Sequence, residues 1–400
     1  MENKRLPQLC DNKTCTGCLA CVNACNKEAL TMTTDKEGFY RPLFNENLCV
    51  SCGLCEKSCP VISPVKRNDE NDIKVFAAWH KNETIRAKST SGGAFSALAS
   101  TILNKGGFVY GAAYTDDLHI KHIEIDAESD LDKLRLSKYA QSCTDETFKQ
   151  VKLRLVEGHL VMFVGSPCQV AGLKNFLHRD YGNLLLVDFI CHGVPSNDML
   201  QAYLHWVENK HGKVNHINFR DKRKGWYDAL RVIKTEKDKD IVMRGNNDNY
   251  WVGFSINNDL QESCYNCVAQ GFPRCSDITI ADFWGIGRKV PFGHKNEIEK
   301  GISMIIVNNR KVMPLFEEAS EKLYVVERTT SEAISGNKTA IQSSHRPKSR
   351  NTIYKDLQIM NYDEFRKKYM VTTLKQKAVK IFREYLPASI VKHIRLKGQK

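Results

Sequence analysis

Long apolar runs are missing from the 400 residues of this chain. The longest, at 160–164 and 184–187, fall far short of the roughly 20 residues that a membrane-spanning helix needs. The first residues, MENKRLPQLC, lack the apolar segment of a secretory signal peptide. We therefore expect a cytoplasmic protein.

A disulfide framework is a second feature that the composition disfavours. The chain has 15 cysteines, so at least one lacks a partner in any scheme that pairs them all. In a reducing compartment, clustered cysteines are more often metal ligands or catalytic groups than disulfides. The cysteines therefore direct attention to metal chemistry.

Acidic residues are fewer than basic ones, 46 against 59, which gives a formal net charge of +13. The last 30 residues contain eight Lys or Arg and one Glu, so much of the excess belongs to the tail. Leu374, Ala378, Ile381 and Phe382 recur there at helical spacing, which predicts a short basic amphipathic helix. A solvated surface helix is the first interpretation, and a weak peripheral membrane contact is the second. No nucleic-acid reading motif accompanies the charge, so we expect no nucleic-acid partner.

Two identical cysteine patterns lie near the N-terminus. Each has the spacing C-x2-C-x2-C-x3-C, and the second repeats the first at an offset of 34 residues. The first run consists of Cys15, Cys18, Cys21 and Cys25, and the second of Cys49, Cys52, Cys55 and Cys59. This spacing is typical of bacterial dicluster ferredoxins, in which the fourth cysteine of each run binds the other cluster.

The crossover rule divides the eight thiols into two ligand sets. We predict one 4Fe-4S cluster on Cys15, Cys18, Cys21 and Cys59, and a second on Cys49, Cys52, Cys55 and Cys25. Such crossing lets the bound metal stabilise a domain that has little core. A pair of zinc knuckles is the alternative, but two such runs do not fit zinc spacing. Asn26 follows Cys25 where Pro60 follows Cys59, and Cys10 receives no role.

The rest of the chain alternates between apolar strands and helical stretches. Predicted strands cover 74–79, 108–114, 159–165, 184–191, 278–282 and 301–308. Predicted helices cover 92–104, 145–157, 168–177, 197–211 and 311–322. This order favours α/β layers around a mixed sheet, whereas 212–260 has shorter, more polar strands that are hard to place.

We therefore expect a chain of α+β and α/β class in four parts. A small two-cluster ferredoxin-like domain covers 1–62, and a polar linker covers 63–74. A larger flavin-binding α/β domain with a mixed sheet follows at 75–330. A basic extension with the amphipathic helix ends the chain at 331–400.

Further cysteines follow predicted strands of the larger domain. Cys168, in the segment GSPCQ, and Cys191, in DFICHG, each stand where a strand gives way to a helix. Open α/β sheets bind ligands at the carboxyl ends of their strands, and a helix N-terminus there favours a thiolate. Cys264 and Cys267 form a C-x2-C pair, and Cys275 follows shortly after. Together these cysteines supply the four thiolates that a third cluster requires.

An anion site is indicated at 88–95, KSTSGGAF, which opens a predicted helix. Small residues and free backbone N–H groups at a helix start suit a flavin pyrophosphate. An ordinary helix capped by serine is the alternative.

Four segments together resemble one known family. STSGGAFSALA, FVGSPCQVAGLK, DFICHGVPS and CYNC with SDITIADFWG, in this order, are similar to the beta subunit of coenzyme F420-reducing hydrogenases and dehydrogenases. The resemblance spans about residues 1–310. That family also includes plant 7-hydroxymethyl chlorophyll a reductase and bacterial proteins found with polysaccharide-synthesis genes. Its members bind FAD and 4Fe-4S clusters, and they pass electrons between the flavin and a deazaflavin coenzyme or another acceptor.

The resemblance implies roles for particular residues. A third 4Fe-4S cluster would be held by Cys168, Cys191, Cys264 and Cys267, with Cys275 as the competing fourth ligand. FAD would be approached by Ser89, Ser91, Gly92, Gly93, Lys138 and Tyr139. His192 is a candidate proton donor, although a packed or helix-capping histidine is the simpler interpretation. No residue is assigned a catalytic role.

The expected function is that of an FAD-dependent iron–sulfur oxidoreductase. It would pass electrons between 4Fe-4S clusters, FAD and an organic donor or acceptor, either a coenzyme F420-like molecule or another small molecule. Polysaccharide biosynthesis is the expected pathway. A non-catalytic electron-transfer subunit of a larger complex is the alternative. The expected partner is a redox protein or a small electron carrier.

Overall fold

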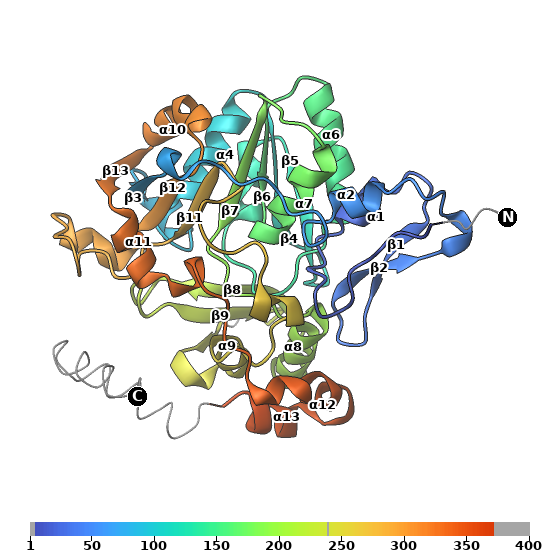
Figure 1. The fold of residues 1–400 in the computed structure, drawn as a ribbon. Coiled ribbons are helices and arrows are strands. Elements are labelled where there is room, and N and C mark those ends of the chain that lie inside the picture. The colour runs from blue at the N-terminus through green and yellow to red at the C-terminus, as the bar shows by residue number, and fades with distance from the viewer. Residues whose placement is uncertain (1–4, 238–239, 372–400) are drawn as a thin grey trace, which may run out of the picture.

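The computed structural model describes residues 5–237 and 240–371. A mixed sheet of eight strands forms the centre of the larger body (Figure 1). Its strands, in spatial order, are β13 (Leu323–Arg328), β3 (Lys74–His80), β12 (Ser303–Val307), β11 (Ile278–Asp282), β7 (Leu184–Phe189), β6 (Val161–Val164), β4 (Phe108–Tyr114) and β5 (Ile120–Ile125). The four neighbours β11, β7, β6 and β4 run parallel, and the flanking pairs are antiparallel.

Helices cover both faces of this sheet. On one face α4 (Ala94–Asn104) and α10 (Met313–Ser320) pack on a core that includes Met162 and Leu185. On the other, α6 (Thr147–Val156) and α7 (Pro167–Leu177) pack on a core that includes Phe163 and Leu186. Adjacent residues of one strand thus belong to opposite cores, as the pleat of a strand requires. Burial on both faces explains why the parallel strands are continuous apolar runs.

A second, antiparallel layer occupies the region that the sequence left unplaced. Strands β8 (Val214–Asp221), β9 (Leu230–Thr235) and β10 (Asp240–Met243) pair in the order β10-β9-β8. Around them pack α8 (Asn197–His211), α9 (Asn249–Ser255), α12 (Ile353–Ile359) and α13 (Tyr362–Tyr369), as Figure 1 shows. Strand β9 is buried at most positions, but β8 and β10 have several exposed ones, so their sequence carries little continuous apolar signal.

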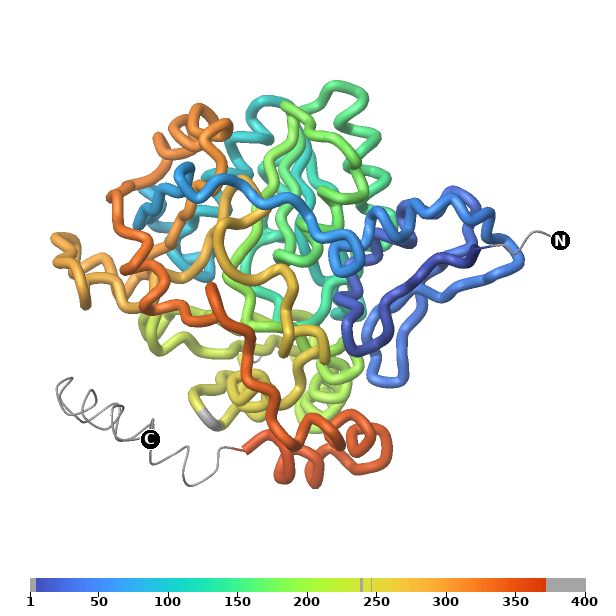
Figure 2. The backbone as a smooth tube through the Cα atoms, viewed as in Figure 1, coloured from blue at the N-terminus to red at the C-terminus, as the bar shows by residue number. Residues whose placement is uncertain are grey.

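The ferredoxin-like region projects from one side of this body (Figures 1 and 2). It contains a hairpin of β1 (Leu30–Thr34) with β2 (Tyr40–Phe44) and two short helices, α1 (Ala20–Ala24) and α2 (Leu54–Ser58). The two helices have the same offset of 34 residues as the two cysteine runs. Both helices contact α7, so the small region rests on the larger sheet domain.

The predicted linker is packed along the body. Figure 2 shows the chain crossing from the ferredoxin-like region to β3. On this path the Arg67 guanidinium donates hydrogen bonds to the backbone oxygens of Val268, Gln270 and Pro273, at 2.9 to 3.2 Å. Asn68 adds a bond from its side-chain amide to the Ser276 oxygen at 2.7 Å. The linker therefore holds the chain segment that follows Cys267.

The predicted architecture is confirmed, with local differences. The predicted elements at 108–114, 197–211 and 278–282 coincide with β4, α8 and β11, and the others differ at their ends by a few residues. The residues after 330, predicted as an extension, begin with α11 (Thr330–Gly336) and remain packed through Met370. Two further short helices are α3 (Glu83–Ala87) and α5 (Leu131–Leu134). The predicted basic helix near 374–385 lies outside the described residues, and within them no helix is long and apolar enough to cross a membrane.

Candidate functional site

A cavity of about 710 Å³ opens at the carboxyl ends of the central strands. Its lining includes Val164 at the end of β6, Phe189 at the end of β7 and Asp282 at the end of β11. Thr16 and Gly17 of the ferredoxin-like region also line it. The position agrees with the rule that α/β sheets bind ligands beyond the carboxyl ends of their parallel strands.

Four of the predicted ligand cysteines line this one cavity. They are Cys168, Cys191, Cys264 and Cys267. Burial raises the pKa of Cys191 to about 12, and the neighbouring thiols of Cys168 and Cys267 add to the shift. Burial also raises the pKa of Cys264, with further contributions from Cys191 and Cys168. The four thiols therefore lie close enough to influence one another electrostatically.

Cys168 lies in the first turn of α7. Ser166 caps that helix together with Gln169, and the Ser166 hydroxyl lies 3.2 Å from the Cys168 sulfur. Burial raises the pKa of Cys168 to about 11. Burial of the thiol therefore opposes the helix dipole, which the sequence analysis expected to favour a thiolate at this position.

The Cys264–Cys267 pair reaches the cavity through contacts with distant segments. Cys264 packs on Gly193, where a β-carbon would come within 3.1 Å of the Cys264 β-carbon. The backbone N–H of Cys267 donates to the Ser343 hydroxyl at 3.0 Å, and the Ser344 hydroxyl donates to the His192 oxygen at 2.6 Å. The segment after residue 340 thus closes over the cysteine pair.

Cys275 occupies a different environment. It is 8% exposed, belongs to the apolar core around α6 and α7, and does not line the large cavity. Burial raises the pKa of its thiol to about 12. The structure therefore groups Cys168, Cys191, Cys264 and Cys267 around one cavity and places Cys275 in the neighbouring apolar core.

A second, much smaller cavity of about 20 Å³ lies inside the ferredoxin-like region. Five thiols line it: Cys10, Cys15, Cys18, Cys21 and Cys59. Three predicted ligands of the first run thus meet the fourth cysteine of the second run, which is the grouping that the crossover rule predicts. The remaining cysteines, Cys25, Cys49, Cys52 and Cys55, do not line it, and Cys52 is exposed to solvent.

The two cysteine regions meet on helix α7. A β-carbon at Gly172 would lie 2.9 Å from the Cys18 sulfur, so only a glycine lets the helix approach this closely. Gly172 lies four residues after Cys168 and therefore on the same face of α7, one turn away. The Cys168 thiol accordingly contributes to the raised pKa of Cys18, after the larger effect of burial.

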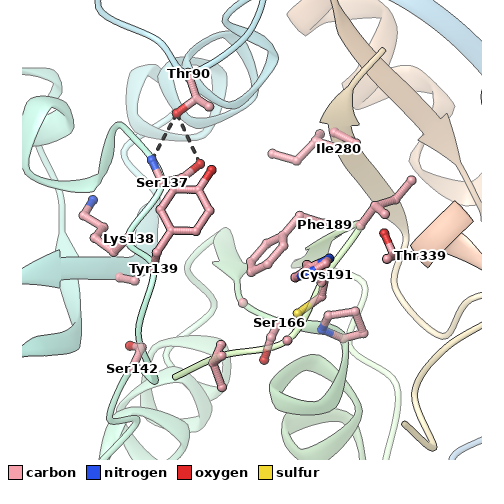
Figure 3. A pocket seen from close by; sticks show the side chains of 18 of the residues that line it. Thr90, Ser137, Lys138, Tyr139, Ser142, Ser166, Phe189, Cys191, Ile280 and Thr339 are labelled. Carbon is pink, nitrogen blue, oxygen red and sulfur yellow. Dashed lines mark hydrogen bonds between the residues drawn. The ribbon is translucent and has the colours of Figure 1, made fainter. Parts of the chain in front are cut away.

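The residues predicted for FAD lie mostly along the same large cavity. Its lining includes Ser89, Ser91, Gly93, Lys138 and Tyr139. In Figure 3, Lys138 and Tyr139 stand beside Ser137, which Thr90 joins by hydrogen bonds, while Cys191 lies across the cavity. Burial lowers the pKa of Lys138 to about 7.

Gly92 differs from this prediction, because it does not line the cavity. Its N–H donates to the Ser303 hydroxyl at 2.9 Å, and a β-carbon there would strike the Ala78 oxygen at 2.3 Å. The glycine therefore permits close packing of the α4 entry on β3 and β12. The Ser303 hydroxyl also accepts a weak bond from the Ala94 N–H at 3.4 Å, so part of the expected anion site is already occupied.

Several lining residues gave no signal in the sequence. His122 is 3% exposed, lies 2.7 Å from the Ser142 hydroxyl through Nδ1, and has a pKa that burial lowers to about 4. Arg220, Asp282 and Trp284 form a polar and aromatic corner. Asp282 and Trp284 lie in the segment SDITIADFWG that carries the family resemblance, whereas His122 and Arg220 belong to no such segment, and only the folded chain brings them together. His192 lines the cavity, and its Nε2 is buried without a hydrogen-bond partner among the described residues.

Comparison with known proteins identifies both regions. Residues 158–333 match the family that describes the C terminus of the coenzyme F420 hydrogenase/dehydrogenase beta subunit, and residues 14–62 match the 4Fe-4S dicluster domain. The chain thus combines an N-terminal 4Fe-4S dicluster domain with a domain of the type found at the C terminus of the F420 hydrogenase/dehydrogenase beta subunit. The dicluster domain implies two 4Fe-4S clusters.

Individual relatives cover different shares of the chain. The ferredoxin-type protein NapF of Escherichia coli K12 is 39% identical over 44 residues, which is 11% of this chain and 27% of that protein, and NapF of strains O6:H1 and O157:H7 gives the same values. The chain therefore matches about a quarter of the length of these curated relatives. A solved structure of the F420-reducing NiFe hydrogenase complex from Methanosarcina barkeri contains a chain with 16% identity and a TM-score of 0.46, covering 73% of this chain and 93% of that one.

The thiols of the dicluster domain fit the clusters that the domain implies. Backbone N–H groups of Gly17 and Ser51 each lie 3.4 Å from a cysteine sulfur, Cys15 and Cys49 respectively, at equivalent positions of the two repeats. In the described part of the chain, no three His, Cys, Asp or Glu side chains converge on a point that suits a single metal ion. A four-iron cube instead takes one thiolate at each of four separated corners.

Proposed function

We propose that the chain is an iron–sulfur flavoprotein oxidoreductase, which passes electrons between 4Fe-4S clusters, FAD and an organic donor or acceptor. The observation that carries the proposal is the lining of the large cavity. Four thiols and five of the six residues expected to contact FAD share that cavity. A metal cluster and a flavin held there would lie next to each other.

The chain's own residues have defined tasks in this proposal. Cys168, Cys191, Cys264 and Cys267 would hold a third 4Fe-4S cluster, and Ser89, Ser91, Gly93, Lys138 and Tyr139 would contact FAD. The clusters would supply single-electron transfer, which FAD would couple to the two-electron chemistry of an organic molecule. Burial of these thiols would keep water away from a cluster held there and so help to set its reduction potential.

The positions of the cysteines support an order of centres. Cys52 is exposed, Cys18 is buried against Gly172, and Cys168 lies one turn closer to the start of α7, where it lines the cavity. Electrons would therefore enter or leave near Cys52, and the cluster on Cys18 would stand between the surface and the cavity. The organic molecule would react at the far end, with a coenzyme F420-like molecule as one candidate. A role in polysaccharide biosynthesis remains part of this proposal.

A second candidate function is that of a non-catalytic electron-transfer subunit of a larger complex. Exposed apolar side chains favour it: Leu43, Leu48 and Val50 are 57%, 48% and 57% exposed, and the last two flank Cys49. Apolar residues around an exposed centre suit a docked protein partner. A redox protein is therefore the partner we propose at this edge, in either function.

Cofactor analysis of the full chain tests both candidates. After anaerobic purification we expect about 12 iron per chain, four for each of three clusters, together with one FAD. A value near eight iron would remove the third cluster, and a value near four would contradict the dicluster assignment. Full iron with no bound flavin, even after reconstitution with FAD, would favour the electron-transfer subunit.

A further inference from the structure

We propose that Arg220 binds an oxoanion, a phosphate or a carboxylate, of the ligand that occupies the large cavity. The side chain is 7% exposed and lines the cavity from strand β8. Its Nε and Nη2 groups are buried and have no hydrogen-bond partner in the described part of the chain. A buried charged donor without a partner is unfavourable, so a ligand atom is the expected acceptor.

The guanidinium is held so that one edge stays available. Its Nη1 lies 3.2 Å from the Asp282 carboxylate, and its central carbon lies 5.1 Å from the centre of the Trp284 ring. The Tyr139 side chain also lies beside the guanidinium. Asp282 is fixed in turn by the Trp226 indole N–H at 2.7 Å. The two unpartnered donors, Nε and Nη2, form the edge of the fork that matches two oxygens of a phosphate or carboxylate.

The charge of the cavity lining agrees with an anionic ligand. Among the described residues, five basic side chains line it: Arg135, Lys138, Arg220, Arg274 and Lys338. Two of these are paired with carboxylates outside the lining, Arg135 with Asp132 and Arg274 with Asp188. Asp282 is the one carboxylate in this described lining, and it is already engaged by Arg220 and Trp226. A cavity with this balance attracts an anion and disfavours a cationic substrate.

Two sources of the oxoanion are compatible with this chemistry. One is the pyrophosphate of FAD, and the other is an acidic group on the organic molecule that reacts with the flavin. The inference rests on the proposed function only in placing a flavin in the cavity. The test therefore distinguishes contacts that Arg220 makes with the flavin ring from contacts that it makes with the FAD phosphates.

The experiment compares Arg220→Gln with Lys224→Gln in the full chain. Lys224 is exposed on the same stretch of chain and does not line the cavity, so it controls for the loss of one positive charge. Flavin-free protein is titrated anaerobically with FAD and with riboflavin, and FAD-loaded protein is titrated with inorganic phosphate while the flavin spectrum is followed. If Arg220→Gln does not fold, Arg220→Lys, which keeps the charge but loses the fork, takes its place.

The outcomes separate the two sources and can overturn the inference. FAD binding weakened about 10- to 100-fold with riboflavin unchanged assigns the fork to the pyrophosphate, in the range that charge-assisted hydrogen bonds provide. Unchanged FAD binding with loss of the phosphate response assigns it to an acidic substrate group. Equal weakening of FAD and riboflavin overturns the proposal, and so does no change in any titration. Failure of wild-type protein to bind any flavin would contradict the proposed function instead.

A second inference concerns Cys10, and its basis is the set of five thiols that line the small cavity. A 4Fe-4S cluster takes four protein ligands, yet Cys10 lines the cavity with the four predicted ones. Its sulfur lies 3.5 Å from the sulfur of Cys59. Both thiols therefore reach the same side of the space that the first cluster would fill.

We infer that Cys10 is a reserve ligand that can replace Cys59 on the first cluster. Cys59→Ala, Cys10→Ala and the double variant are purified anaerobically, and iron content and the EPR spectrum of the reduced protein are measured. Both single variants are expected to keep the wild-type iron content, with an altered spectrum for Cys59→Ala, and the double variant is expected to lose about four iron. If Cys59→Ala does not fold, Cys59→Ser replaces it in both backgrounds.

A different pattern of iron loss would overturn the inference about Cys10. Loss of about four iron from the single Cys59 variant, with no further loss in the double variant, would show that Cys10 cannot act as a ligand. A wild-type protein with only about four iron would contradict the dicluster assignment itself.

Discussion

Replacing Cys267 with serine tests the third ligand set most directly, because the structure separates it from the competing Cys275. A cluster on Cys191 and Cys264 would close a loop of about 70 residues, and a cross-link of that span stabilises a fold by about 4 kcal/mol. The Cys267→Ser variant should therefore contain about four fewer iron atoms per chain, and its free energy of unfolding should fall by up to about 4 kcal/mol. FAD retention should fall with it, since Cys267 and the predicted flavin residues line one cavity.

Cys275→Ser is the matched control. It also removes one buried thiol, but from the apolar core beside α7. We expect a loss of about 1–3 kcal/mol, because a hydroxyl replaces sulfur in an apolar site, with iron and flavin unchanged. Iron and FAD per chain are measured after anaerobic desalting, and stability by denaturant unfolding. The reasoning is refuted if Cys275→Ser loses about four iron while Cys168→Ser loses none.

Three further predictions follow from single contacts. Gly172→Val should push α7 away from Cys18, whose sulfur a β-carbon would approach to 2.9 Å; we expect iron loss from the first cluster, seen as a missing EPR component. Arg67→Ala should release the backbone after Cys267 and reduce iron by up to about four per chain, whereas the exposed Arg5→Ala should not. Burial lowers the pKa of His122 to about 4 in the folded protein, so between pH 6.5 and 4 this histidine is protonated in the unfolded chain but neutral in the folded one. The free energy of unfolding should therefore fall by up to about 3 kcal/mol as the pH falls from 6.5 to 4. His122→Gln should flatten that part of the profile of melting temperature against pH, and an unchanged slope would contradict the assignment.

Sequence alone predicted the features that appear as a continuous apolar run or as a repeated spacing of cysteines. The parallel strands are buried on both faces, so β4 and β11 were visible as apolar runs. The eight cysteines of the two runs were visible because their spacing repeats. Strands in 212–260 were expected but not placed, because β8 and β10 each have exposed positions and little apolar continuity.

The rest of the site depends on contacts between distant segments. Arg220 sits in the polar stretch NFRDKRKG, where nothing distinguishes it from its basic neighbours until Asp282 and Trp284 fold against it. Cys10 lies outside the repeated spacing, so only the folded chain shows it beside Cys59. Arg67 belongs to a linker-like composition, yet its guanidinium is bound by three backbone oxygens. Tertiary placement, which composition does not encode, decides these roles.

The contact between Gly172 and Cys18 has a kinetic consequence. Cys168 and Gly172 are one turn apart on a single helix, about 6 Å along its axis, so a rigid spacer separates the two centres proposed near them. Under the proposed function, electron tunnelling between those centres needs no swing of one domain against the other. Its rate should therefore be insensitive to solvent viscosity, and any gated step in turnover should lie at the docking edge near Cys52 or in exchange of the organic molecule.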